Sequence, residues 1–207
     1  MQSKNLFLIS IFFVAMIFSA CGNKKIGLQT WSTTNLDVST FQNGDIIPEA
    51  KTAEEWYKAG IEGKPIWCCY NIDPSNGKKY GKLYNWYAVK DARGIAPKGW
   101  HVPSDAEWKT LTAYLGGEVA ICAKIKSNGG WEGNYNGSNQ SGFEALPGGY
   151  CDENMAFTRI GKNVSWWSST ESRAGFAYAR SINYNYDFFF GLDKSEQCGL
   201  SVRCIRD

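Results

Sequence analysis

Residues 100–117 read WHVPSDAEWKTLTAYLGG and contain the clearest helix start in the chain. Ser104 and Glu107 stand three positions apart after a proline, which is the spacing of a capping box. Apolar residues then recur every three or four positions and share one helix face: Trp108, Leu111 and Leu115. The pattern predicts an amphipathic helix that ends at Gly116-Gly117.

The chain before residue 100 predicts shorter elements. A second capping box predicts a helix over Ala53–Ala59. Residues 83–89 carry aromatic side chains that favour a strand, but also a helical apolar spacing, and we favour the helix. Ile66–Tyr70 is typical of a buried strand, and residues 73–77, which read DPSNG, are typical of a turn.

The last part of the chain alternates short strand-like segments with turns. These segments are Ala156–Ile160, Ser165–Ser169, Phe176–Ile182, Asp187–Leu192 and Leu200–Ile205. A glycine- and asparagine-rich stretch, residues 126–149, precedes them and is expected to be loop. Helices early and strands late predict an α+β fold with a mostly antiparallel, twisted sheet.

The N-terminus has the features of an export signal. A lysine, an apolar run over residues 6–18 and small residues precede Cys21, and this order resembles the lipobox of bacterial lipoproteins. The run is shorter than the roughly 20 residues that a spanning helix needs. We expect a signal peptide at 1–20, a lipidated tether at 21–28 and one domain at 29–207. Gly22, in place of aspartate, favours the outer membrane; an ordinary signal peptide or an uncleaved anchor is the alternative.

Charge and cysteine usage narrow the class of protein. Lysine and arginine number 22 against 20 acidic residues, which gives no basic face for nucleic acid. Export would expose the six cysteines beyond Cys21 to an oxidising compartment, where disulfides are the default. Six cysteines allow 15 pairings, and the sequence alone does not choose among them. A single histidine and no CxxC spacing argue against zinc.

Five ordered strings together resemble one known family. They read YGKLYNWYAV (80–89), APKGWHVPSDAEW (96–108), GFEALPGGY (142–150), WWSSTE (166–171) and SVRC (201–204). On these strings the chain is identified as a member of the Fibrobacter succinogenes major paralogous domain family, over about residues 30–207. Members of that family are often lipoproteins.

The family in turn resembles the formylglycine-generating-enzyme branch of the C-type lectin fold. The resemblance implies a C-type-lectin-like fold with two short early helices and termini close together. It also implies a disulfide between Cys68 and Cys204, at positions where the family usually carries cysteine. Cys69, Cys122, Cys151 and Cys198 depart from the family pattern and stay unassigned. Cys198 and Cys204 only loosely resemble the copper-binding pair of those enzymes, and we interpret them as disulfide or buried thiol.

Residues 183–190, which read NYNYDFFF, are the candidate ligand-binding segment. Tyrosine supplies rigid contact area and asparagine adaptable hydrogen bonds, as in binding loops. The resemblance places the ligand face of lectin-like folds in this late region. Side chains alternate along a strand, so we expect one aromatic stripe of Tyr184, Tyr186 and Phe188. The polar contacts are expected from Asn183, Asn185 and Asp187; the alternative is an ordinary hairpin with cross-strand aromatic pairs.

Other candidate residues are explained by structure more readily than by chemistry. His101 has no nearby nucleophile in sequence, and we expect it to cap or pack. Adjacent Asp152-Glu153 and the Asp105/Glu107 pair lack a calcium-loop spacing. Trp131, Trp166 and Trp167 present flat faces to a sugar, but packing is the safer interpretation.

The sequence thus predicts a non-enzymatic cell-envelope lipoprotein that binds an extracellular protein or glycan. It predicts no cofactor, no nucleic acid and membrane contact only through the lipid. An enzyme on the formylglycine-generating scaffold, an enzyme processing carbohydrate, and a purely structural surface component are the alternatives.

Overall fold

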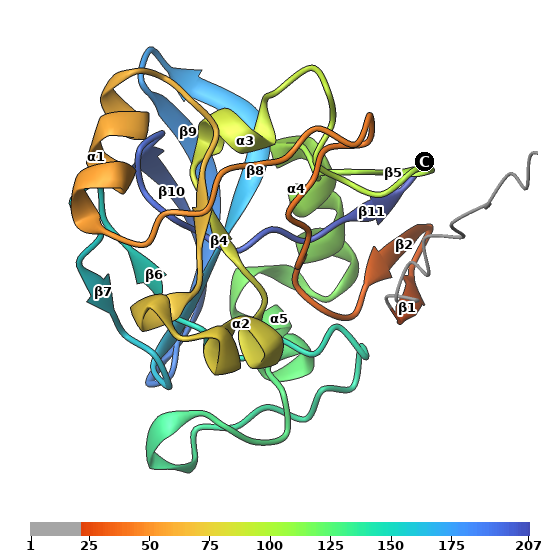
Figure 1. The fold of residues 1–207 in the computed structure, drawn as a ribbon. Coiled ribbons are helices and arrows are strands. Elements are labelled where there is room, and N and C mark those ends of the chain that lie inside the picture. The colour runs from red at the N-terminus through yellow and green to blue at the C-terminus, as the bar shows by residue number, and fades with distance from the viewer. Residues whose placement is uncertain (1–21) are drawn as a thin grey trace, which may run out of the picture.

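The computed structural model describes residues 22–207, and a three-stranded antiparallel sheet forms its centre (Figure 1). The strands are β8 (Asn163–Arg173), β9 (Phe176–Asn183) and β10 (Tyr186–Ser195), in the order β10-β9-β8. Trp166 pairs with Arg180, and Trp167 with Ala179. Successive side chains on β8 therefore point to opposite faces of the sheet.

Both faces of this sheet are covered by core. Trp166 and Trp167 are each fully buried, and they belong to different hydrophobic clusters. On one side Trp166 packs with Trp108, at 5.9 Å between ring centroids, and with Phe143 at 5.6 Å. On the other side the Trp167 indole donates to the carbonyl of Tyr84 at 2.7 Å. The tryptophan pair is packing on both faces, as expected for a strand at the centre of a domain.

The two ends of the described chain meet in one sheet. Its strands are β1 (Asn23–Ile26), β2 (Gln29–Ser32), β11 (Ile205–Arg206) and β5 (Trp100–His101), in the order β1-β2-β11-β5. Ile205 pairs with Trp31 and with His101, so the C-terminal strand lies between early segments. Residues expected to form a polar tether after Cys21 instead form β1, hydrogen-bonded to β2.

Two further sheets have two short strands each. β3 (Trp67–Cys68) pairs with β4 (Leu83–Tyr84), and β6 (Tyr150–Cys151) pairs with β7 (Phe157–Thr158). Every pairing between named strands is antiparallel. Mixed helices and antiparallel sheets confirm the predicted α+β class.

Five α-helices surround the central sheet. They are α1 (Ala53–Ile61), α2 (Pro74–Tyr80), α3 (Trp86–Val89), α4 (Asp105–Tyr114) and α5 (Gly117–Ile125), with single 3₁₀ turns at Tyr70–Ile72 and Glu132–Asn134. The capping box of α4 is confirmed: Ser104 accepts from the Glu107 amide, and the Glu107 carboxylate accepts from the Ser104 amide at 2.8 Å. In α1, Thr52 caps as expected, but Glu55 accepts from the Lys51 amide.

The turn predicted at DPSNG was wrong, the helix predicted over residues 83–89 is confirmed only over α3, and the predicted end of α4 at Gly116-Gly117 is confirmed. The DPSNG stretch begins α2, because Asp73 caps the helix and Pro74 stands at its first turn, where a missing amide costs nothing. Residues 83–89 divide at Asn85 into β4 and α3, since the buried Asn85 side chain accepts from the Ala88 amide and starts a new helix. Gly116-Gly117 ends α4 but does not end helical structure, because Gly116 in the left-handed region turns the chain into α5.

A buried arginine connects segments that are far apart in sequence. Arg203 is 1% exposed, and its guanidinium donates to the Asn35 side chain and to the carbonyls of Ser32 and Phe143, each at 2.7 Å. A fourth hydrogen bond, of 2.8 Å, goes to the carbonyl of Glu144. Arg203 thereby fixes the start of the domain and the 126–149 loop to the C-terminal segment.

No helix among residues 22–207 is long and apolar enough to cross a membrane. The predicted signal peptide and the lipidation site Cys21 lie outside the described residues.

Arg203→Ala is expected to lower the free energy of unfolding by about 4 kcal/mol, because it leaves several buried acceptors without a donor. Arg203→Lys is expected to recover only part of this loss, since one ammonium cannot span the same acceptors. Urea unfolding followed by tryptophan fluorescence measures both. Arg206→Ala, at an exposed position on β11, is the control. An Arg203→Ala loss below about 1 kcal/mol would contradict this role.

Candidate functional site

The predicted ligand segment forms the tip of the β9–β10 hairpin. Tyr184 and Asn185 are the turn residues, and Tyr186 pairs with Asn183 across it. The register of the two strands shifts between Tyr186 and Phe190, which is a bulge in the ladder. The segment therefore projects from the sheet as an irregular tip and not as one straight strand.

An aromatic stripe is present two residues later than predicted, and one of its three rings is exposed. Phe188 and Phe190 have ring centroids 4.9 Å apart, and Tyr186 and Phe190 have theirs 6.3 Å apart. Tyr186 is 62% exposed, and the two phenylalanines are half-buried. We call Tyr186, Phe188 and Phe190 the aromatic cluster. Side chains at every second position share one face of a strand, so counting from Tyr186 would have placed Phe190 in the stripe.

Tyr184 was wrongly assigned to this stripe because it lies in the turn, where the alternation of a strand does not apply. Its ring meets Tyr135 edge-on, with centroids 5.5 Å apart. Tyr135 is 52% exposed and belongs to the 126–149 loop. The tip thus carries a second aromatic pair contributed by two segments, and sequence reasoning missed Tyr135.

Phe189 forms the base of the aromatic cluster. It is fully buried, with its ring 6.0 Å from Trp108 and 6.5 Å from Trp166 between centroids. The three consecutive phenylalanines therefore divide between core and surface, as alternation along a strand requires. Burial of the middle ring fixes the backbone that presents Phe188 and Phe190.

The predicted polar contacts differ in exposure. Asn185 and Asp187 are exposed, and the Asp187 carboxylate is 80% exposed. Asn183 is half-buried and accepts from the side chain of Asn163 on β8 at 3.1 Å. Asn185 and Asp187 thus remain available on the surface, whereas Asn183 helps to hold the hairpin.

A buried lysine supports the turn. Lys126 is 3% exposed, and its ammonium donates to the carbonyl of Tyr184 at 2.9 Å and lies 3.9 Å from the Asp187 carboxylate. Burial lowers the pKa of Lys126, while Asp187 opposes this shift. The same ammonium lies 5.2 Å from the centre of the Trp131 ring. Sequence alone gave no signal for a contact across 58 positions.

The cysteines do not pair as predicted. No disulfide joins Cys68 to Cys204, and the two side chains belong to different hydrophobic clusters. The Cys68 sulfur instead lies 4.0 Å from that of Cys151. Burial raises the pKa of Cys198 to about 12, and its sulfur lies 3.7 Å from the Glu153 carboxylate. Cys198 is therefore a thiol at neutral pH and not a reactive thiolate.

The acidic candidates Asp105 and Asp152 form ion pairs and hydrogen bonds within the fold. Asp105 forms an ion pair with the buried Arg180 and another with Lys109 at 2.8 Å. The Asp152 side chain accepts from the amides of Asn154 and Ala156, both at 2.9 Å, which is an Asx-type turn. Among residues 22–207 there is no group of three or more histidine, cysteine or acidic side chains arranged to hold a metal ion.

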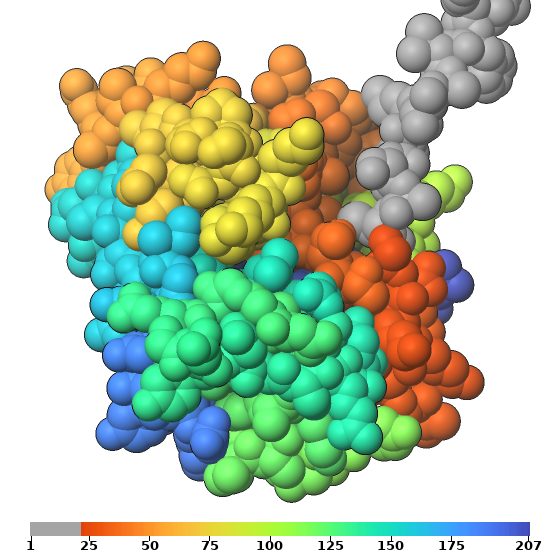
Figure 2. Space-filling model, turned by 90° about the horizontal axis from the view of Figure 1, so that it is seen from below, coloured from red at the N-terminus to blue at the C-terminus, as the bar shows by residue number. Residues whose placement is uncertain are grey.

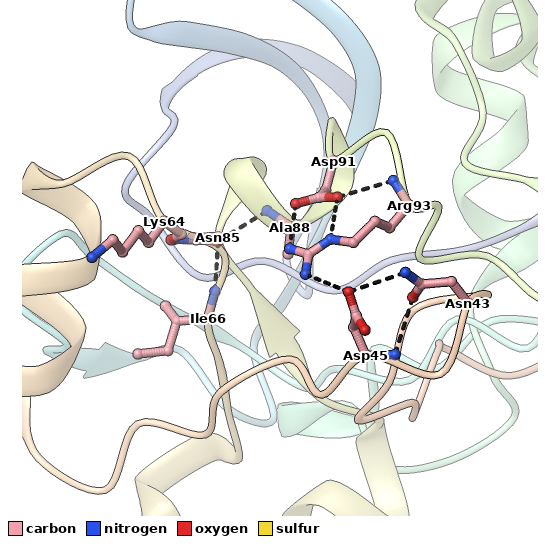
Figure 3. Close-up of polar contacts among 8 residues, drawn as sticks. All are labelled: Asn43, Asp45, Lys64, Ile66, Asn85, Ala88, Asp91 and Arg93. Atoms are coloured by element: carbon pink, nitrogen blue, oxygen red, sulfur yellow. Dashed lines mark hydrogen bonds and ion pairs between the residues drawn. The ribbon is translucent and has the colours of Figure 1, made fainter.

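Two further networks hold the loops around α3 (Figure 3). Arg93 forms an ion pair with Asp91 at 2.8 Å and with Asp45 at 3.1 Å, and its hydrogen bonds lower the pKa of Asp91. Buried Asn85 accepts from the Ile66 amide at 3.1 Å and donates to the Lys64 carbonyl at 2.8 Å. Each network joins segments that are about 20 to 50 positions apart in the chain, which is a structural role.

His101 joins two carboxylates from different elements. Its Nδ1 lies 2.7 Å from Asp207, and its Nε2 lies 2.8 Å from Glu107. Partial burial of the imidazole opposes protonation, but the hydrogen bonds to Glu107 and Asp207 outweigh it and raise the pKa of His101. His101 thus connects the capping box of α4 to the last residue, and this contact is structural.

These features define an α+β domain with both faces of its sheet buried and an aromatic hairpin tip at its surface. The chain belongs to the family described as the Fibrobacter succinogenes major domain, whose model matches residues 25–206. No curated protein and no solved structure matches this chain. The family assignment made from the five sequence strings is confirmed.

His101 is expected to make stability depend on pH. A raised folded-state pKa means that its contribution is present below about pH 6.5, the unfolded value, and is lost as pH rises through the folded-state pKa. The urea midpoint of the wild type should exceed that of His101→Gln most at pH 5.5, and the difference should shrink at pH 8.5. A difference that is constant across this range would contradict the assignment.

Proposed function

We propose that this protein is a cell-envelope lipoprotein whose lectin-like domain binds an extracellular protein or glycan through the tip of the β9–β10 hairpin. The observation that carries the proposal is the aromatic cluster, which exposes Tyr186 beside two half-buried phenylalanines. Apolar surface that is rimmed by polar residues is typical of interaction sites, and here one exposed ring stands beside two half-buried rings. The proposed role is binding and not catalysis, and no cofactor is expected.

The way the tip is held favours a binding site. Phe189 fixes the strand from below, and Lys126 fixes the turn through the Tyr184 carbonyl. A ligand would therefore meet side chains whose backbone is already ordered, which lowers the entropic cost of binding. The neighbouring Asn185 and Asp187 supply exposed hydrogen-bonding groups at the rim.

The sequence resemblance to lectin-like folds favours the same surface. Pairing of β2 with β11 brings the ends of the domain together, which the resemblance leads one to expect. The hairpin tip lies in the late strand–loop region that forms the ligand face in that fold. Both points are analogies that favour the proposal, whereas the chemistry of the tip is its basis.

The proposed anchor and the proposed ligand face are separate. Gly22 accepts from the Thr33 amide at 2.8 Å, so the residue after Cys21 is already part of the domain. A lipid on Cys21 would hold the β1–β2 hairpin close to the membrane, which we propose is the outer membrane. In Figure 2 the medium-blue atoms of β10 lie on the other side of the view from the red atoms of β1 and β2. The β9–β10 region and the attachment point would then lie on different sides of the domain in this view.

Tyr186→Ala combined with Phe188→Ala is expected to abolish ligand binding, because truncating true anchor side chains costs about 2 kcal/mol or more each. Fluorescently labelled protein on a defined glycan array and on an array of secreted and surface proteins measures binding. Tyr57→Ala, at a 49% exposed tyrosine on α1, is the matched control. The melting temperature should barely change in either variant. Unchanged binding by the double variant on features that the wild type binds would refute the site.

Cys21→Ser is expected to release the protein from the membrane fraction or to leave it unprocessed, because the thioether to the lipid cannot form. Fractionation of cells with immunoblotting, and the apparent mass of the mature protein, measure this. Cys122→Ser, at a buried core position, is the control. A Cys21→Ser protein of unchanged mature size in the membrane fraction would exclude lipid anchoring.

A further inference from the structure

Two buried cysteines from distant parts of the chain face each other. The sulfurs of Cys68 and Cys151 are 4.0 Å apart, across 83 sequence positions, and both residues have no exposed surface. Cys68 ends β3 and Cys151 ends β6, so the contact joins two of the small sheets. Both side chains belong to the hydrophobic cluster around Trp56.

The backbone holds both cysteines in place. Cys68 pairs with Leu83 in the β3–β4 ladder. Cys151 exchanges two hydrogen bonds with Gly199, of 3.0 and 2.9 Å. A Cβ atom at position 199 would come within 2.4 Å of the Cys151 sulfur, so glycine provides the space that this sulfur occupies. A disulfide has its sulfurs about 2.05 Å apart, so the two sulfurs would have to approach each other by about 2 Å.

The neighbouring cysteines are placed differently. Cys69 follows Cys68 directly, but its side chain lies in the cluster that contains Trp167. Cys122 lies in the third cluster, on α5. The fold therefore selects one partner for Cys151 from the adjacent pair Cys68-Cys69.

We propose that Cys68 and Cys151 form a disulfide bond in the mature protein. The proposal depends on the export of the chain but not on its ligand-binding role. A thiolate of one cysteine attacks an external disulfide, such as that of a disulfide oxidoreductase, and forms a mixed disulfide while one donor thiol leaves. The second cysteine then displaces the other donor thiol. Two electrons and two protons pass from the cysteine pair to the donor, which becomes a dithiol.

Burial determines when this bond forms. Burial raises the pKa of Cys151 well above its usual value, so the folded protein does not offer its thiolate to an oxidant. Both cysteines have no exposed surface once the domain has folded, so we expect oxidation before or during folding. After packing, the same burial excludes reductants, and the bond ties the early part of the domain to the region after residue 149.

Peptide mapping of the full chain tests the proposal directly. The protein is exported with its own leader, trapped with iodoacetamide under acid denaturation, digested without reduction and analysed by mass spectrometry. The expected product is a linked peptide pair whose fragment ions place the bridge at Cys68 and not at Cys69. Alkylated thiols at Cys68 and Cys151, or a bridge from Cys151 to any other cysteine, overturn the proposal.

A second measurement separates this proposal from the question of export. The full chain is denatured, reduced and refolded with reduced and oxidised glutathione, and the melting temperature is compared with that of protein kept reduced. The wild type and Cys122→Ala should melt about 10 °C lower when kept reduced, because a long closed loop is released. Cys151→Ala should show no such difference. Equal melting temperatures for the oxidised and the reduced wild type would refute the disulfide. This outcome does not depend on the result of the cell fractionation.

Discussion

The hydrogen bonds of one buried guanidinium determine how the rest of this domain is assembled. Arg203 donates to the segment before α1 and to the loop before β6, so it connects regions 59 to 171 positions away. Asn35, which accepts from Arg203, also accepts from the Trp166 indole at 2.9 Å and donates to the carbonyl of Tyr80 at 2.7 Å. Burying the Arg203 guanidinium removes its hydrogen bonds to water, which is costly unless protein acceptors replace them. The acceptors must therefore all be in position when the guanidinium becomes buried.

The same network explains why five separate strings identify the family. Arg203, Phe143, Trp166 and Tyr80 each come from a different string, and the fifth contributes Trp108, whose ring meets those of Trp166 and Phe143. The strings are therefore the contact points of one core and not separate sites. A motif made of core contacts identifies a fold without assigning a chemistry, and the search for function has to move to the surface.

Local rules predicted the parts of this fold that local interactions determine. The α4 capping box and the alternation of Trp166 with Trp167 depend on spacing within one element, and both were read correctly from sequence. The DPSNG stretch was misread because Asp-Pro serves both turns and helix starts. The turn position of Tyr184 and its support by Lys126 depend on a bulge and on a contact 58 positions away. No spacing rule within the segment contains that information.

The arrangement of the hairpin tip follows from the buried sheet beneath it. At the hairpin tip, β10 extends beyond the part of the sheet whose two faces are both buried. Side chains alternate along a strand, so those on one face of β10 still reach the core, whereas those on the other face lie at the surface. Phe189 remains against Trp108, and its neighbours on either side are left at the surface. The rings of Phe188 and Phe190 also contact each other, with centroids 4.9 Å apart, so the cluster contributes some packing of its own. The proposed binding site depends on aromatic side chains at these outward positions, and the core below supplies the rigidity that such contact requires.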